Sequence, residues 1–195
     1  MPVEPIITAL LTLVAYLFGS ISAAIITCKI MGLPDPRTQG SNNPGATNVL
    51  RIGGKKAAVI TLIGDMLKGL LPVLLAVIIK SDDLTLALVA SAAFLGHLYP
   101  VFFGFKGGKG VATAFGAIAG VSWPVALAML VTWLTVAYGL KISSMSALVT
   151  AALAPFYFWW FSGSSTLIIM AVFISILLIW RHRSNIKRML AGTEK

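Results

Sequence analysis

The chain has 195 residues, of which 58% are hydrophobic and 11% charged, and its mean hydropathy is +0.93. Soluble domains average about 25% charged residues, so this composition excludes an ordinary soluble protein and indicates lipid as the main solvent. The formal net charge of +9 is better explained by anionic lipid headgroups and anionic substrates than by nucleic acid, which we do not expect as a partner.

Apolar stretches near the length of a membrane span, about 20 residues, recur along the chain. The first begins after Met1-Pro2-Val3-Glu4, which lacks the basic segment of a cleavable signal, so we expect this stretch to be retained. It contains the single cysteine, Cys28, for which packing is the expected role. The candidate spans are residues 6–31, 57–79, 84–99, 146–161 and 165–180.

Residues 111–140 are too long for one span, because a single helix of that length would extend about 45 Å. Ser122 is a candidate N-cap and Pro124 suits a first helical turn, so we expect a break there. Two short helices or a re-entrant hairpin would return the chain to the side from which it entered.

Most of the 15 lysines and arginines lie at one end of the predicted spans, whereas Lys80 lies at the other end beside two aspartates. Positive residues mark the cytoplasmic side of membrane proteins. We therefore predict an all-α integral membrane protein with seven transmembrane helices, two of them short, with the N-terminus outside and the C-terminus in the cytoplasm. No second domain is evident, so residues 1–195 are expected to form one transmembrane domain.

Two glycine-rich polar segments interrupt the apolar sequence. The first island is Gly40-Ser41-Asn42-Asn43-Pro44-Gly45-Ala46-Thr47-Asn48, and the second is Phe105-Lys106-Gly107-Gly108-Lys109-Gly110. Glycine lets backbone N–H groups approach an anion closely, and lysine adds charge. The second island also precedes a predicted helix, whose N-terminus favours anions. Together the islands indicate one phosphate-rich site.

The predicted topology places both islands at the cytoplasmic face, together with a serine cluster and the polar segment after the last span. The cluster consists of Ser143, Ser144 and Ser146, and the segment runs from Arg181 to Asn185. We expect these four patches to share one interfacial pocket. The islands could also be simple turns and topogenic charges, but turns alone do not require lysines.

Several common catalytic motifs are missing. The second island is not a Walker A loop, because Gly110 follows Lys109, and the chain has no Gly-x-Ser-x-Gly elbow. Two distant histidines and one cysteine do not form a metal site, so we expect neither a metal nor a cofactor. A His-x4-Asp pattern, which would place an acid near a histidine base, is also absent.

Some ionisable residues have both structural and functional interpretations. Asp65 and Lys68 are three residues apart inside a span, where a structural ion pair is expected first and ordering of the pocket second. His97 suits the C-terminal end of its helix. His182 and Asn185 can share one helix face, or belong to a solvated tail.

These residues resemble a family of small bacterial integral-membrane glycerol-3-phosphate acyltransferases that use acyl phosphate as donor. The resemblance covers most of the chain. It is carried by Gly19-Ser20, the first island with Arg51, Asp65-x-x-Lys68-Gly69, Gly96-His97-x-x-Pro100-Val101-Phe102, the second island with Val111-Ala112-Thr113, and Arg181-His182-x-x-Asn185-x-x-Arg188. Each motif alone is moderately specific, whereas their combination in this order is highly specific.

The resemblance implies transfer of a fatty acyl group from acyl phosphate to glycerol 3-phosphate, giving lysophosphatidic acid and phosphate, in a bacterial inner membrane with the site facing the cytoplasm. Three residues are expected to be catalytic: Ser41, Lys109 and His182. The expected substrate-binding residues are Gly40, Asn43, Gly45, Asn48, Arg51, Lys106, Gly107, Gly108, Gly110, Ser144 and Asn185. Lys141 stands where the family pattern has arginine, and the choice among the three clustered serines remains open.

An acyl phosphate is already activated, so the chemistry requires positioning and charge stabilisation more than a protein nucleophile. We expect the acceptor hydroxyl to attack the acyl carbon directly, with its proton passing to the donor phosphate or to His182. A transporter for a phosphorylated molecule is the alternative, although transporters place their sites near the midplane and often contain repeats. A structural subunit would leave both islands unexplained.

Overall fold

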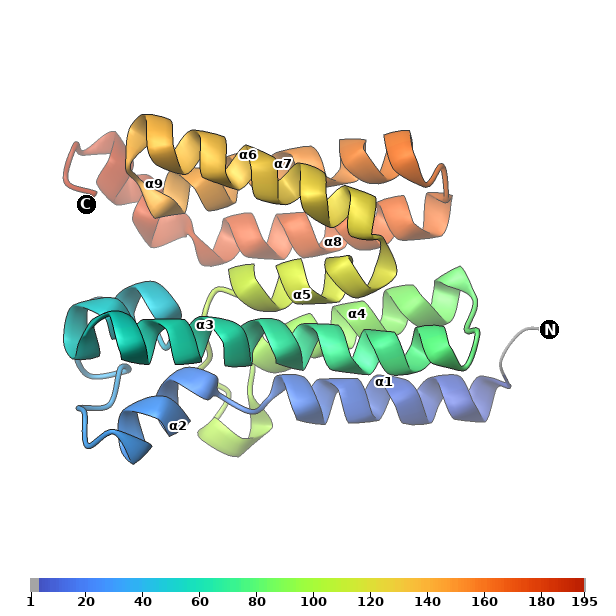
Figure 1. The fold of residues 1–195 in the computed structure, drawn as a ribbon, viewed down its shortest axis with the longest axis horizontal. Helices are drawn as coiled ribbons and strands as arrows, with labels where there is room; N and C mark the ends of the chain where they lie inside the picture. Colours follow the sequence, from blue (N-terminus) through green and yellow to red (C-terminus); the bar gives the residue numbers. More distant parts are fainter. Residues whose placement is uncertain (1–3, 195) are drawn as a thin grey trace. The chain divides into compact units, whose positions relative to one another are not determined.

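The computed structural model describes residues 4–194, and every regular element in that range is a helix (Figure 1). The all-α prediction is therefore confirmed. The chain forms two compact units, of which unit 1 ends at Val121 and unit 2 begins at Ser122. The expectation of one transmembrane domain over the whole chain stays a prediction.

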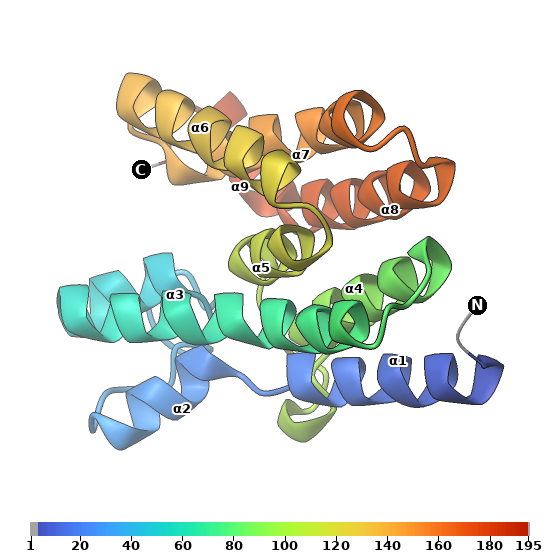
Figure 2. The same ribbon diagram turned by 45° about the vertical axis from the view of Figure 1, so that its right-hand side comes forward.

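Unit 1 contains five α-helices and a short 3-10 helix (Figures 1 and 2). Helix α1 packs against α4, and α3 packs against α5, α2, α4 and α1. The bounds of the elements are α1 Pro5–Gly19, α2 Ala23–Ile30, α3 Ala46–Ile78, α4 Asp83–Leu98, η1 Val101–Phe103 and α5 Val111–Val121.

The first span is not the single continuous helix that its hydropathy predicted, because the helix breaks between α1 and α2. The hydroxyl of Ser20 donates to the carbonyl of Tyr16 at 2.8 Å, which ends α1. Ser22 is extended and accepts a 3.5 Å hydrogen bond from the N–H of Ile25, and so begins α2. Hydropathy does not register such a break, since serines can satisfy the backbone groups that it exposes.

Helix α3 begins at Ala46, eleven residues before the predicted start at residue 57, and is interrupted at Gly54. Gly54 has φ of 75° and ψ of −172°, a conformation that is open to glycine and costly for other residues. The turns from Ala46 to Gly53 therefore form a separate short helical segment, which begins within the first island and includes its last three residues. A connecting loop was expected here instead of a helix.

Reciprocal glycine contacts hold the helices of unit 1 close together. A Cβ at Gly19 would collide with the Ala93 carbonyl, and a Cβ at Gly96 would collide with the Tyr16 carbonyl. Helices α3 and α5 approach each other through Gly69 and Gly116 in the same way. Small residues permit this close backbone approach between membrane helices, where lipid removes most of the hydrophobic driving force.

Unit 2 contains four helices, α6 Trp123–Leu140, α7 Ser143–Phe161, α8 Ser165–Arg181 and α9 Arg183–Leu190. Helix α7 packs against both α6 and α8 (Figure 2). The predicted break before α6 is confirmed, with Ser122 at the N-cap position and Pro124 in the first turn. The side chain of Ser122 makes no capping hydrogen bond, however, and its backbone is extended.

Five segments of the described chain are long and apolar enough to cross a membrane, and the pair α8–α9, bent by 56°, makes a sixth when it is counted as one span. Helix α5 has 11 residues and is shorter than a span. Large apolar side chains such as Ile6 and Ile169 are about 70% exposed, as expected for a surface in contact with lipid. Seven crossings and the orientation of the termini stay predictions.

Candidate active site

The first island is held in shape by one buried side chain, Asn48, which is 1% exposed. Its Oδ1 accepts a 2.8 Å hydrogen bond from the N–H of Ser41, and its Nδ2 donates to the carbonyls of Pro36 and Gln39 at 2.9 and 3.0 Å. A Cβ at Gly40 would collide with Asn48 Oδ1, and Gly40 has φ of 63°. Asn48 was predicted to bind substrate; these contacts favour a positioning role instead.

The Ser41 backbone amide is therefore committed to Asn48, so the island is not simply a row of amides facing a ligand. The Ser41 side chain is exposed, and Asn43 and Gly45 are half-buried. What the loop can offer an anion is the Ser41 hydroxyl together with its neighbours, in a conformation that Asn48 fixes.

The two islands meet inside unit 1. A Cβ at Gly108 would lie 2.8 Å from the Pro44 carbonyl, so the backbone of the second island is in direct contact with the first. Gly107 passes equally close to the carbonyls of His97 and Leu98. The two islands are therefore in contact, and their glycines are required for this approach. The expectation that all four polar patches share one phosphate-binding pocket stays a prediction.

A salt bridge braces the loop that leads into the first island. The guanidinium of Arg37 bonds both carboxylate oxygens of Asp35, with a shortest contact of 2.6 Å, and its Nη1 reaches the Phe103 carbonyl at 3.5 Å. The hydrogen bonds from Arg37 lower the pKa of Asp35 and outweigh the effect of burial. The loop is thus tied to η1, just before the second island.

Beneath the second island lies a buried ion network of Asp65, Lys68, His97 and Thr113. Lys68 Nζ lies 2.9 Å from Asp65 Oδ1 and His97 Nδ1 lies 3.5 Å from the same oxygen, while Thr113 Oγ1 is 3.1 Å from His97 Nδ1. The predicted ion pair is therefore confirmed, and so is the position of His97 in the last turn of α4.

The other predicted cations lie around the islands. Arg51 is on the short helical segment before Gly54, and both Arg51 and Lys106 are exposed. Lys109 is half-buried and is followed by Gly110, which has a positive φ of 86°. The second island leads directly into the first turn of α5, as the sequence predicted. An anion held there would also interact favourably with the helix N-terminus.

In unit 2, a second polar cluster forms around Glu194. Its Oε1 accepts hydrogen bonds from Ser144 Oγ at 2.7 Å and Asn185 Nδ2 at 2.5 Å, and its Oε2 accepts one from Arg188 Nε at 2.6 Å. Burial raises the pKa of Glu194, but these three donors outweigh it and hold the pKa below its ordinary value. We refer to these four residues as the Glu194 cluster.

The contacts of Glu194 distinguish among the three candidate serines. Ser144 joins Asn185 through the carboxylate, whereas the Ser146 hydroxyl donates to the Ile142 carbonyl within its own helix. Ser143 is half-buried at the first position of α7. Ser144 is thus the serine that the structure associates with the predicted residues of the C-terminal segment.

His182 connects α8 and α9 and is 3% exposed, while Asn185 is 5% exposed. The alternative of a solvated tail is therefore wrong for both residues. His182 Nδ1 lies 2.8 Å from the Leu178 carbonyl, which can only accept, so Nδ1 carries the proton of this hydrogen bond. In the neutral imidazole, Nε2 is then the nitrogen able to take up a proton.

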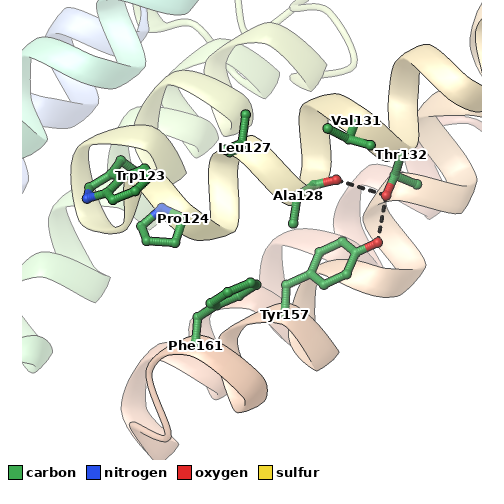
Figure 3. Close-up of a pocket in the computed structure, with 8 residues that line it drawn as sticks. All are labelled: Trp123, Pro124, Leu127, Ala128, Val131, Thr132, Tyr157 and Phe161. Atoms are coloured by element: carbon green, nitrogen blue, oxygen red, sulfur yellow. Dashed lines mark hydrogen bonds between the residues drawn. The ribbon is translucent and has the colours of Figure 1, made fainter.

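Unit 2 also has an apolar groove of about 460 Å³ between α6 and α7, opposite in character to the polar cluster (Figure 3). Two of its lining residues, Thr132 and Tyr157, have hydroxyls that are 2.6 Å apart. The groove is lined by Trp123, Pro124, Leu127, Ala128, Val131, Thr132, Tyr157 and Phe161. None of the predicted site residues is among them, and this lining suits hydrocarbon rather than phosphate.

Comparison with known proteins identifies the family to which these clusters belong. The model of the glycerol-3-phosphate acyltransferase family matches residues 9–192. The chain belongs to this family. Two relatives, both named glycerol-3-phosphate acyltransferase, are 54% identical to it: one from Methylococcus capsulatus, covering 100% of this chain and 96% of the relative, and one from Thioalkalivibrio sulfidiphilus, covering 97% and 93%.

The family also includes solved structures. Crystal structures of PlsY, an integral membrane glycerol 3-phosphate acyltransferase, match the chain with TM-scores of 0.93 for the glycerol 3-phosphate form and 0.88 for the lysophosphatidic acid form. The identities are 41% and 40%, and each match covers 96% of this chain and 94% of the other. The fold, the membrane class and the family expected from the motifs are thereby confirmed.

Sequence reasoning missed two residues of these clusters. Thr113 was noted only as part of a motif, and Glu194 was not considered. Glu194 carried a usable signal, because it is one of only six acidic residues in a chain with 15 basic ones and lies in the same tail as His182 and Asn185. Thr113 carried no such signal in the sequence, because its contact with His97 depends on how two helices pack.

Proposed function

We propose that the protein transfers a fatty acyl group from acyl phosphate to glycerol 3-phosphate, forming lysophosphatidic acid and inorganic phosphate. The family and the names of its relatives support the acceptor and the acyl transfer. We further propose that the reaction takes place at the cytoplasmic face of a bacterial inner membrane, and that the whole chain acts as one transmembrane domain. The basic residues near the span ends support this orientation.

The observation that carries the proposal is the contact between the two islands at Pro44 and Gly108. It gathers the Ser41 hydroxyl, flexible glycine backbone and the lysines of the second island in one part of unit 1. Both proposed substrates bear a phosphate, and this chemistry suits phosphate. The donor also has a lipid-soluble tail, so it meets a water-borne acceptor most readily at the membrane surface.

In the proposed reaction, a hydroxyl oxygen of glycerol 3-phosphate attacks the acyl carbon, and the bond from that carbon to the phosphate oxygen breaks. The new ester stays on the glycerol, and inorganic phosphate leaves with the bonding electron pair. Lys109 and neighbouring amides would stabilise the charge that develops on the carbonyl oxygen and on the leaving phosphate. No covalent intermediate with the enzyme is required, because the mixed anhydride is already activated.

The proton of the attacking hydroxyl has two possible destinations in this scheme, the departing phosphate or His182. The hydrogen bond from His182 Nδ1 to the Leu178 carbonyl supports the second route, because it leaves Nε2 as the basic nitrogen. Substitution of His182 by alanine decides between the routes. Near-normal turnover with an unchanged pH profile would exclude His182 as an obligatory base.

The direct test uses purified protein in lipid with labelled glycerol 3-phosphate and either acyl phosphate or acyl coenzyme A. We expect lysophosphatidic acid from acyl phosphate without any other protein. Ser41→Ala and Lys109→Ala should strongly reduce the product while the proteins remain folded. Uptake of label into vesicles without product would instead indicate a transporter, and activity like wild type in both variants would overturn the site assignment.

A further inference from the structure

Three ionisable side chains are buried together in the apolar part of unit 1. Asp65, Lys68 and His97 are 3%, 4% and 6% exposed. Lys68 Nζ contacts Asp65 at 2.9 Å and also donates to the Ile21 carbonyl at 2.8 Å, in the break between α1 and α2. Buried charges are costly, and apolar residues of similar size often give equal or greater stability. Their presence therefore requires an explanation other than stability.

His97 extends the ion pair toward the second island. Its Nδ1 faces both Asp65 Oδ1, at 3.5 Å, and Thr113 Oγ1, at 3.1 Å. Thr113 is fully buried in the first turn of α5, three residues after Gly110. One imidazole thus links a side chain of α3 to the helix that follows the second island.

The second island and the first turn of α5 are attached to His97 at two points. On one side, the N–H of Gly108 donates to the His97 carbonyl at 3.2 Å, and a Cβ at Gly108 would collide with the imidazole ring. On the other side, Thr113 contacts the ring nitrogen. Lys109 and Gly110 lie between these two attachments, so both attachments restrict the movement of their backbone.

We propose that the buried ion network is a positioning device for the second island, in which Asp65 and Lys68 fix the His97 ring and the ring fixes the backbone around Lys109. None of the four residues needs to touch substrate. This inference rests on the proposed function for its effect on catalysis, but the fixing of the backbone can be measured without any substrate.

The sharpest test changes Thr113, because substitution of a buried charge could prevent folding. Thr113→Val removes the hydroxyl with little change in volume, and Thr113→Ser keeps it. Thr61→Val is the matched control, because Thr61 is equally buried in unit 1 and its hydroxyl has no hydrogen-bond partner among residues 4–194. The three variants and wild type are compared in lipid nanodiscs by thermal unfolding, hydrogen exchange of residues 105–112 and steady-state kinetics.

We expect Thr113→Val to lower kcat/KM for glycerol 3-phosphate about tenfold, the loss that corresponds to one buried hydrogen bond. Because the proposed lysine contacts strengthen as charge develops, kcat should fall more than KM rises. Exchange of residues 105–112 should be faster in Thr113→Val alone. Thr113→Ser and Thr61→Val should behave like wild type in all three measurements.

A second substitution tests the ring itself. His97→Asn places an amide near the position of Nδ1, whereas His97→Leu removes both ring nitrogens. We expect slower turnover and faster exchange of residues 105–112 in His97→Leu than in His97→Asn. Equal behaviour of the two variants would count against the network.

Unchanged exchange of residues 105–112 in Thr113→Val would overturn the proposal, as would equal losses in Thr113→Val and Thr61→Val. A wild-type protein that made no lysophosphatidic acid from acyl phosphate would contradict the proposed donor. The exchange difference between Thr113→Val and Thr113→Ser would still decide whether the network holds the island.

Discussion

In each unit, one side chain fixes a candidate substrate-binding segment through hydrogen bonds. The two side chains differ in charge: an amide in unit 1 and a carboxylate in unit 2. Asn48 in unit 1 both donates and accepts: it binds the carbonyls of Pro36 and Gln39, just before the first island, and the N–H of Ser41 within it. Glu194 in unit 2 only accepts, and it collects three donors. A neutral amide can organise a loop of mixed backbone groups at any pH, whereas a carboxylate selects donors and depends on its own protonation.

The largest effect is expected from Asn48→Asp. The new carboxylate can still accept from Ser41, but its second oxygen would face the carbonyls of Pro36 and Gln39, and two buried hydrogen bonds would become repulsive contacts. We expect kcat/KM to fall about 100-fold or more, from about 3 kcal/mol of lost interaction. Product formation from labelled glycerol 3-phosphate measures this loss.

Asn42→Asp is the control for the added charge. Asn42 lies in the same island, is exposed, and has φ of 55°, a conformation that aspartate tolerates. If this variant loses as much activity as Asn48→Asp, the cause is electrostatic repulsion of an anionic substrate, and the role of Asn48 as a clamp is contradicted.

A smaller effect is expected when the carboxylate in unit 2 is removed. Glu194→Ala leaves Ser144 and Asn185 without their acceptor, and we expect kcat/KM to fall about tenfold. Glu194→Gln should lie between this variant and wild type, because its amide oxygen can still accept. The exposed Glu4, changed to glutamine, serves as the matched control and should retain full activity.

Ser144→Ala removes one of the three donors to Glu194 and should lower kcat/KM by about threefold. Ser146→Ala removes a buried hydroxyl that bonds only within its own helix, so its activity should stay near wild type. The ratio between the two variants is the quantity to measure. A greater loss of activity in Ser146→Ala than in Ser144→Ala would contradict the assignment of Ser144 to the site.

The smallest effect is the pH response expected from Glu194 in unit 2. Because its folded-state pKa is lowered, ionised Glu194 contributes stability above its unfolded-state pKa, and this contribution is lost as pH falls through the folded-state value. The protection factors of residues 183–194, which correct hydrogen exchange for the slower intrinsic exchange in acid, should therefore fall on acidification in wild type and change much less in Glu194→Gln. Residues 36–48 are held by the neutral amide of Asn48, so the pH dependence of their hydrogen exchange should be the same in wild type and in Glu194→Gln.

Hydropathy predicted the helical class and most of the long helices, because lipid imposes length and apolarity on every span. The break before α6 was predicted from Ser122 and Pro124, which suit the start of a helix. Hydropathy did not predict the break at Ser20–Ser22 or the interruption at Gly54, since both lie in apolar or helix-compatible sequence. In each case a local hydrogen bond or a left-handed glycine, rather than composition, ends the helix.

The glycines and lysines of the islands could be proposed as a site because their chemistry is local: glycine backbone beside a cation indicates an anion. The contacts that hold them could not be predicted. The hydrogen bonds of Asn48 and of Glu194 were not foreseen, because their partners become known only when distant segments are brought together, and substrate binding by Asn48 stays a prediction. Contacts between residues 144 and 194, or 97 and 113, leave no periodic trace in the sequence.

The reciprocal glycine contacts between α1 and α4 and between α3 and α5 have a consequence for mutational surveys of this enzyme family. Even a methyl group at Gly19, Gly69, Gly96 or Gly116 would strike a carbonyl of the facing helix, which cannot rotate away as a side chain can. In a saturation screen scored by cell growth, these four positions will therefore rank beside Ser41 and Lys109. Abundance in the membrane separates the two groups, because the glycine variants fail to accumulate whereas the site variants accumulate in an inactive form.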